Sequence, residues 1–146
     1  MKIEWRQTLG LLSLAAMVAV TVGCQSQQTK PKRAEPVEGL QSVYFDFDRS
    51  DIKSEYKATL DNNSSWMNDH SKANVVVEGN CDQRGSVEYN IALGWRRARS
   101  AKNYLVSSGV SADRLATKSF GKENLVCTET VESCYWKNRR ADFKAK

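Results

Sequence analysis

A carboxylate and a guanidinium on either side of a glycine-containing turn are the side chains of this sequence best suited to binding a charged group. Asp82 precedes Arg84-Gly85, and Arg97 lies 11 residues beyond Ser86. We expect Asp82 on a loop beside a helix N-terminus, where backbone N–H groups favour anions. A carboxylate paired with the planar fork of an arginine favours recognition of a ligand that carries both charges.

Arg97 is expected on the inward side of its helix, because it follows Leu93 by four residues and Tyr89 by eight. An arginine that faces inward must be paired. One solution is an internal salt bridge between Asp82 and Arg97. The other is a zwitterionic ligand whose ammonium meets the aspartate and whose carboxylate meets the arginine. The residues alone leave both open, with a small preference for the salt bridge.

Catalysis and metal binding have weaker support. Cys81 and His70 resemble a thiol nucleophile with its base, but His70 falls in a polar helix end and Cys81 follows a buried strand. Asp46 and Asp48 alternate along an expected strand and would face opposite sides, so they do not make an acid–base pair. The cysteines and the one histidine are too scattered for the usual zinc spacings. We therefore expect no enzyme, metal or cofactor.

Residues 1–23 have the pattern of an export signal that ends in a lipoprotein box. The apolar run from Leu9 to Val22 is 14 residues long, which is short of the roughly 20 needed to span a membrane and typical of a signal peptide. Because small Gly23 precedes Cys24, Cys24 is expected to become the first mature residue and to carry several acyl chains, which anchor a protein firmly. An ordinary signal peptide with an incidental cysteine is the alternative.

Residues 24–39 are polar and contain the only two prolines of the chain, a composition typical of a flexible tether. The full sequence carries a formal charge of +5, and residues 1–23 contribute +1 of it, which leaves +4. This mild excess of positive charge would suit binding to an acidic polymer. It is weak evidence for nucleic-acid binding, because an exported protein seldom meets nucleic acid. In an oxidising compartment we also expect a disulfide between Cys127 and Cys134.

From residue 40 the pattern predicts one domain, 40–146, with strands and helices in the order β-α-β-α-β-(α)-β. Ser50 and Asp51 are the expected N-cap choices for the first helix, Ser86 caps the second, and Gly109 ends it. We expect an α+β sandwich whose helices pack on one mixed four-stranded sheet. The expected elements are strands at 43–47, 74–78, 115–120 and 140–144, and helices from 50–51 to 68, 86–109 and 129–138.

Several motifs in series resemble the OmpA-like peptidoglycan-binding domain family. They span nearly the whole domain, from about residue 43 to 143, and with the lipoprotein signal they resemble in particular its lipoprotein branch, the peptidoglycan-associated lipoproteins. One departure is Asn80, where the family usually has His. We expect this position to be structural, with Asn80 making the hydrogen bond that the histidine would make. The motifs are Phe45-Asp-Phe-Asp48, the segment 78–98, Tyr104-Leu105 with Gly109-Val110, Ser119-Phe-Gly121 and Asn138-Arg-Arg140.

The resemblance implies a ligand and its binding residues. The ligand is the free end of diaminopimelate in the peptidoglycan stem peptide, with Asp82 holding its ammonium and Arg97 its carboxylate. Asp48, Asn90 and Arg139 would complete the pocket, together with backbone amides around Arg84 and Gly85. The function implied is that of an outer-membrane lipoprotein that faces the periplasm and ties membrane to wall, with the Tol proteins as candidate partners. The alternative is a protein-interaction module in which Asp82 and Arg97 are only structural.

Overall fold

The computed structural model describes residues 39–146. The predicted signal peptide, the predicted lipidation site Cys24 and residues 24–38 of the tether lie outside the described residues. No helix within residues 39–146 is long and apolar enough to cross a membrane.

The main elements occur in the predicted order, and two short 3₁₀ turns, Ser54–Tyr56 and Ala112–Arg114, precede α1 and β3. The elements are β1 (Val43–Tyr44), α1 (Lys57–Asp69), β2 (Val75–Asn80), α2 (Val87–Ser107), β3 (Leu115–Gly121), α3 (Glu132–Asn138) and β4 (Arg140–Ala145).

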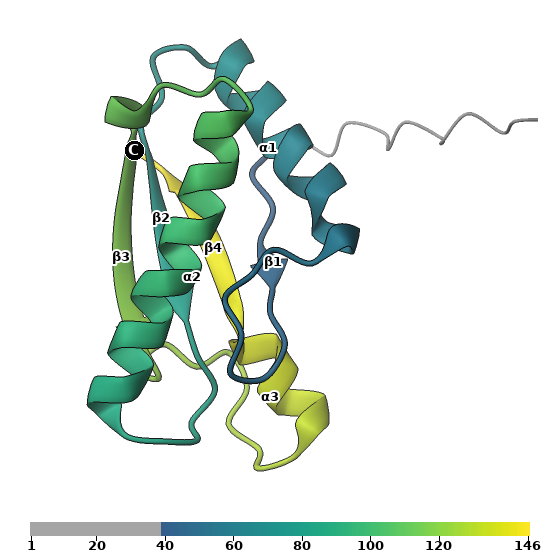
Figure 1. The fold of residues 1–146 in the computed structure, drawn as a ribbon, viewed down its shortest axis with the longest axis vertical. Helices are drawn as coiled ribbons and strands as arrows, with labels where there is room; N and C mark the ends of the chain where they lie inside the picture. The colour runs from purple at the N-terminus through teal and green to yellow at the C-terminus, as the bar shows by residue number, and fades with distance from the viewer. Residues whose placement is uncertain (1–38) are drawn as a thin grey trace, which may run out of the picture. The chain divides into compact units, whose positions relative to one another are not determined.

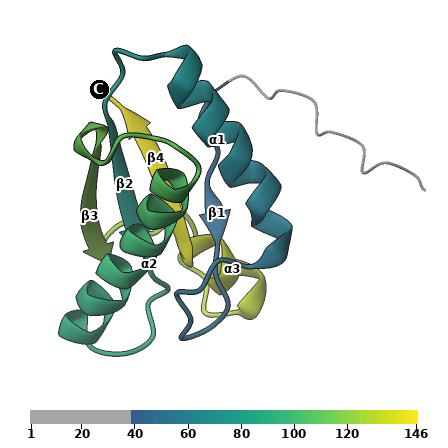
Figure 2. The ribbon, with the colours of Figure 1, turned by 45° about the horizontal axis from the view of Figure 1, so that its top comes forward.

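The four strands form one mixed sheet in the order β1-β4-β2-β3. β4 runs antiparallel to both β1 and β2, whereas β2 and β3 are parallel and are joined by α2. α1 and α2 lie on the same face of this sheet (Figures 1 and 2). The prediction of an α+β sandwich with helices packed on a mixed four-stranded sheet is confirmed, as is the central place of β2.

Both predicted ends of α2 are confirmed by the backbone geometry. The Ser86 hydroxyl oxygen accepts a hydrogen bond from the Tyr89 backbone N–H at 3.1 Å, which satisfies one of the free donors of the first turn. At the other end, Gly109 has a φ of 95°, the left-handed conformation that commonly ends a helix and that glycine adopts most easily.

Two predicted boundaries are wrong at the start of the domain. β1 ends at Tyr44 rather than at residue 47, because the chain turns away and the carbonyl of Asp46 accepts from Arg97 instead of from a neighbouring strand. α1 begins at Lys57 after a 3₁₀ turn, and neither predicted cap residue caps it. The Asp51 carboxylate accepts instead from Nε of Arg49 at 2.7 Å.

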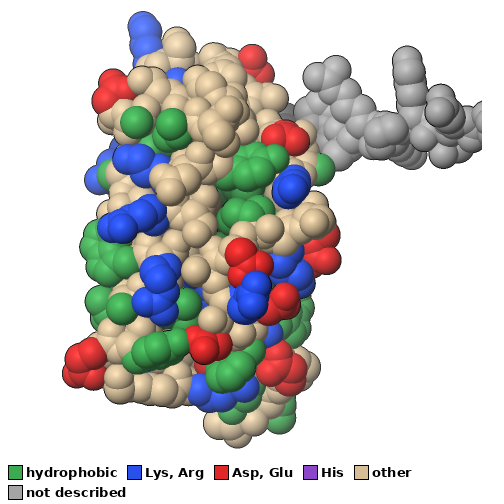
Figure 3. Space-filling model, in the orientation of Figure 1, with side chains coloured by type: hydrophobic (Ala, Val, Ile, Leu, Met, Phe, Trp, Pro, Cys, Tyr) green, Lys and Arg blue, Asp and Glu red, His purple; other side chains and the backbone are tan. Residues whose placement is uncertain are grey.

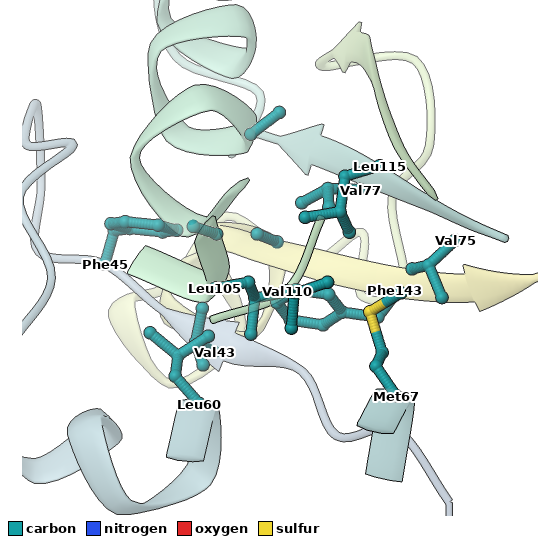
Figure 4. Packing of buried hydrophobic residues seen from close by; sticks show 13 residues of the cluster. Val43, Phe45, Leu60, Met67, Val75, Val77, Leu105, Val110, Leu115 and Phe143 are labelled. Carbon is teal, nitrogen blue, oxygen red and sulfur yellow. The ribbon is translucent and has the colours of Figure 1, made fainter. Parts of the chain in front are cut away.

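The core lies between the helices and the sheet, and Figure 4 shows side chains from α1, α2 and the strands meeting there. α2 approaches β2 closely where two glycines face each other. A Cβ on Gly79 would lie 1.8 Å from the carbonyl oxygen of Gly94, so no larger residue fits between helix and strand. This contact fixes α2, and with it Arg97, against the end of β2.

The predicted apolar face of α2 is correct over its later turns and wrong at its start. Leu93, Ala101 and Leu105 are buried as expected. Tyr89 and Ala92 are exposed, and the buried side of these first turns is formed by Asn90 and Leu93 instead.

Candidate functional site

Three segments that are distant in the sequence meet at one end of the sheet. They are the loop between β1 and α1, the loop between β2 and α2, and α3 with the residue that follows it (Figure 1). The two loops, α2 and Arg139, which follows α3, line a pocket with a volume of about 150 Å³. Figure 3 shows acidic, basic and hydrophobic side chains next to one another at the lower end of the domain.

The pocket brings together all five residues that the sequence assigned to ligand binding. Three of them are almost fully buried cationic or anionic side chains, which is unusual unless such groups are paired. The five are Asp48, Asp82, Asn90, Arg97 and Arg139.

Arg97 faces inward as predicted and is 0% exposed. Its Nε donates to the carbonyl of Arg49 at 2.9 Å, and its Nη1 and Nη2 donate to the carbonyls of Asn80 at 2.8 Å and Asp46 at 3.2 Å. Burial lowers the pKa of Arg97 from its ordinary value. These bonds use three of the five N–H groups of a guanidinium, so two remain that can donate to a ligand's carboxylate.

Asp82 is bonded to two other arginines, not to Arg97. Its carboxylate accepts from Arg84 Nη2 at 2.6 Å and from Arg139 Nη1 at 3.3 Å. Burial alone raises the pKa of Asp82, but hydrogen bonds from Arg84, its charge and the bond from Arg139 outweigh burial and lower the pKa. The salt bridge between Asp82 and Arg97 that the sequence favoured is therefore wrong. Arg84, which lies two residues from Asp82 along the chain, donates to the Asp82 carboxylate in place of Arg97.

Arg139 connects the pocket to α3 and to the residue that follows β1. Besides Asp82, its guanidinium donates from Nη2 to Oε1 of Glu132 at 2.6 Å and from Nε to the carbonyl of Phe45 at 3.0 Å. Its side chain is 7% exposed, so Arg139 is a fixed wall of the pocket.

Asp48 and Asn90 shape the loops of the pocket. Asp48 has a positive φ of 56°, and its carboxylate accepts a hydrogen bond from the Tyr89 hydroxyl. The Asn90 amide donates to the carbonyls of Arg84 at 2.7 Å and Ser86 at 3.0 Å. Asn90 therefore holds the loop that carries Arg84, while Asp48 and Tyr89 join the loop between β1 and α1 to the first turn of α2.

Three pocket residues were missed or misplaced by the sequence analysis. Phe47 and Tyr89 line the pocket, although the first was read as part of a strand and the second as part of the core. The Arg84 side chain was missed because only its backbone was considered. Its spacing of two from Asp82 was a usable signal, since Asp82 also accepts from the Arg84 backbone N–H at 3.1 Å in a tight turn.

Asn80, which stands where the family usually has histidine, lies behind the pocket and does not line it. It is 0% exposed. Its amide nitrogen donates to the carbonyl of Glu78 at 3.0 Å, and its amide oxygen accepts from Asn124 at 3.2 Å. Its backbone carbonyl accepts from Arg97. These contacts give Asn80 a structural role.

The cysteines are consistent with a structural role in the domain. A disulfide joins Cys127 and Cys134, and Cys81 is a buried free thiol. Burial raises the pKa of the Cys81 thiol to about 11, which leaves it protonated and unreactive at neutral pH. Within residues 39–146, no three His, Cys, Asp or Glu side chains are grouped to hold a metal ion.

Comparison with known proteins agrees with this fold. The OmpA family model matches residues 44–139. The chain is 41% identical over 140 residues to a peptidoglycan-associated lipoprotein of Pasteurella multocida, covering 90% of this chain and 93% of that protein. It is 37% identical over 148 residues to one of Mesorhizobium japonicum, covering 90% of this chain and 88% of that protein.

A solved structure shows the same arrangement of elements. The crystal structure of the peptidoglycan-associated lipoprotein from Burkholderia pseudomallei superposes with a TM-score of 0.73 at 34% identity, covering 80% of this chain and 98% of that one. The names of these relatives describe lipoproteins associated with peptidoglycan rather than enzymes, in agreement with the expectation that this protein is not an enzyme. The chain thus belongs to the OmpA family and, within it, to the peptidoglycan-associated lipoproteins.

Proposed function

We propose that this protein is an outer-membrane lipoprotein whose domain binds peptidoglycan non-covalently and so ties the membrane to the wall. The observation that carries the proposal is that Asp82 and Arg97 line one pocket and are both buried yet not bonded to each other. Relatives that match almost the whole chain are named peptidoglycan-associated lipoproteins, which supports the same conclusion.

The ligand we propose is the free end of diaminopimelate in an uncross-linked stem peptide. That end carries an ammonium and a carboxylate on one carbon. The carboxylate would accept from the two remaining N–H groups of Arg97, and the ammonium would donate to Asp82. Arg139 and Asn90 would hold the surrounding loops, and Asp48 with Tyr89 would close the opening.

Cross-linking provides a selective test of this ligand. An amide bond at the diaminopimelate nitrogen removes its positive charge. A cross-linked stem would therefore disrupt contacts of Asp82 without providing another cation for its carboxylate. An unpaired charge in a buried site costs several kcal/mol. We therefore expect binding to stems with a free amine and little binding to cross-linked ones.

The anchor and the partners complete the proposal. Cys24 would carry the acyl chains, and the polar residues that follow would let the domain reach the wall from the inner surface of the outer membrane. Tol proteins are the candidate partners, which would place the protein in the Tol-Pal system and in envelope constriction during cell division.

A protein partner is also favoured by one observation on a different face. Tyr44 of β1 and alternate residues of β4 line a hollow together with the exposed Trp136 and Val126. Lys137 and Lys144 in this hollow form no ion pair within residues 39–146. The exposed apolar surface beside unpaired cations fits an acidic protein segment.

The deciding experiment is sedimentation of the chain with diaminopimelate-type peptidoglycan. The chain is made without its signal and with Cys24→Ser, and compared with Asp82→Asn, Arg97→Ala and the exposed control Arg99→Ala. Loss of one charge-assisted contact should weaken binding about 10- to 100-fold in the first two variants and not in the control. If both variants stay folded and bind normally, the pair is structural, and Trp136→Ala with Lys144→Glu would then test the protein-partner function.

A further inference from the structure

The carboxylate of Asp82 has no acceptor position left for a ligand. A carboxylate offers about four lone-pair sites, and Asp82 accepts four hydrogen bonds. Oδ1 accepts from the backbone N–H and the Nε of Arg84, both at 3.1 Å. Oδ2 accepts from Nη2 of Arg84 at 2.6 Å and Nη1 of Arg139 at 3.3 Å. Since Asp82 is 4% exposed, an incoming ammonium must replace one of these donors.

The side chain of Arg84 accounts for two of the four bonds and is the donor best placed to leave. It is 35% exposed, whereas the side chain of Arg139 is 7% exposed and is also bonded to the carbonyl of Phe45 and to Glu132. The backbone N–H of Arg84 belongs to the turn itself. Withdrawal of the Arg84 side chain would free one lone pair on each oxygen, which is what an ammonium needs.

The surroundings of Arg84 form a cation site rather than an incidental contact. Its guanidinium carbon lies 4.1 Å from the centre of the Phe47 ring and 4.2 Å from that of Tyr135. Glu132 Oε2 lies 3.7 Å from its Nη2. Aromatic faces and carboxylates together attract cations. Arg84 thus occupies, from within the chain, the kind of position that a ligand ammonium would take.

We propose that Arg84 is a built-in counter-ion of Asp82 that the ammonium of the ligand displaces, so that Arg84 sets the affinity and the charge selectivity of the pocket. This inference rests on the proposed function. Binding is then an exchange of one cation for another at Asp82. A ligand without a positive charge cannot displace Arg84 from Asp82, so the ion pair stays intact and continues to occupy the site.

The test is calorimetric titration with the tripeptide L-Ala-γ-D-Glu-meso-diaminopimelate and with the same peptide acetylated on its free diaminopimelate amine. The proteins carry Cys24→Ser and are wild type at the site, Arg84→Gln or Arg84→Lys. Without the competing cation, Arg84→Gln should bind the free-amine peptide about 5- to 10-fold more tightly than wild type. Arg84→Lys, which keeps the charge but not the fork, should fall between the two. The acetylated peptide should gain nothing.

The outcomes separate this inference from the proposed function. If the wild-type site does not bind the free-amine peptide, the proposed function fails and the inference with it. If wild type binds and Arg84→Gln binds equally or more weakly, Arg84 is a ligand contact or a bystander, and only the inference fails.

A measurement on the unaltered site covers the case in which Arg84→Gln does not fold. The ¹⁵N–¹H signals of the arginine Nε groups report their hydrogen bonds. On saturation with the free-amine peptide, the Arg84 Nε signal should shift as its bond to Asp82 breaks, while the Arg139 Nε signal, bonded to the Phe45 carbonyl, should stay. An unchanged Arg84 signal at saturation would overturn the inference.

Discussion

Arg97 and Asp82 line the same pocket, yet the buried guanidinium of Arg97 is bonded only to backbone carbonyls while the carboxylate of Asp82 is bonded to Arg84 and Arg139. The two opposite charges are therefore held apart by the fold rather than neutralising each other. A pocket built in this way holds a buried cation and a buried anion that do not neutralise each other, and the anion is already paired with Arg84 and Arg139.

Arg97→Ala should lower the free energy of unfolding by about 2–3 kcal/mol, because the buried carbonyl of Asn80 loses its donor, as do the partly buried carbonyls of Arg49 and Asp46, and an unsatisfied buried acceptor costs about 1–3 kcal/mol. Arg97→Lys should recover part of this loss, since an ammonium has three donors, but it should not restore binding of a carboxylate to a planar fork. Urea unfolding and peptidoglycan sedimentation measure the two effects separately.

The exposed Arg99 on the same helix is the matched control for Arg97. Arg99→Ala should change the free energy of unfolding by no more than about 0.5 kcal/mol, as surface substitutions usually do. Equal effects of Arg97→Ala and Arg99→Ala would show that the three carbonyl bonds do not stabilise the fold.

Cys81 makes the stability of the domain depend on pH in the alkaline range. In the unfolded chain its thiol loses a proton near pH 8.5, whereas in the folded protein burial raises its pKa to about 11. The folded state therefore binds the proton more tightly, and this stability is present below pH 8.5 and is lost as the pH rises towards 11. The loss should reach about 2–3 kcal/mol at pH 11.

Comparison with Cys81→Ala isolates this effect, since lysine and tyrosine side chains titrate in both proteins. Urea unfolding at pH 8, 9, 10 and 11 should give curves that converge, with the wild type losing its advantage as the pH increases. Curves that stay parallel over this range would mean that Cys81 does not keep its proton in the folded protein.

The sequence predicted the order of the elements well because each rests on local patterns. Ser86 and Gly109 define α2 through a cap and a left-handed turn, and both act within a few residues. The boundary of β1 failed because it is set by a distant side chain: Arg97 takes the carbonyl of Asp46 that a longer strand would have used. Long-range competition of this kind leaves no mark on a local pattern.

At the site, too, the identity of residues was predictable from the sequence, whereas their long-range contacts were not. The resemblance identified five of the residues that line the pocket, but which charges pair could not be read from spacing along the chain. Asp82 and Arg97 looked like partners because both are inward and opposite in charge. The side chain of Arg84 was overlooked, although it alone supplies two of the four bonds to Asp82.

Removing the disulfide should weaken the domain without unfolding it. The bridge between Cys127 and Cys134 closes a loop with a sequence separation of 7, and the chain-entropy relation gives about 2–3 kcal/mol for a loop of that size. The loop has a second clamp: the buried Asn138 amide accepts from the backbone N–H of Val126 at 2.9 Å and donates to the carbonyl of Cys127 at 2.6 Å.

The double variant Cys127→Ser/Cys134→Ala should therefore remain folded at 25 °C, and addition of Asn138→Ala should cause a further loss of about 1–3 kcal/mol. Urea unfolding of the three proteins measures both steps. Complete unfolding of the double variant would show that the amide clamp does not hold the loop by itself.

Asp142 joins the far side of the sheet to the pocket. Its carboxylate accepts from the Ser42 hydroxyl at 2.6 Å, from Nε of Arg140 at 2.9 Å and from the amide of Asn80 at 3.4 Å. Both Arg140 and Asp142 are less than a tenth exposed. Asp142→Ala should therefore cost about 3–5 kcal/mol, because it leaves a buried guanidinium without its anion.

The double variant Arg140→Met/Asp142→Leu should be more stable than Asp142→Ala, since apolar groups of similar volume can replace a buried ion pair at little cost. Urea unfolding measures this difference, with the exposed Asp113→Ala as a control expected to change stability by no more than about 0.5 kcal/mol. Asn80 accepts from Arg97 through its carbonyl, so Asp142→Ala should also weaken binding to peptidoglycan. A fully folded Asp142→Ala protein with normal stability would show that Asn80 and Arg140 do not depend on this carboxylate.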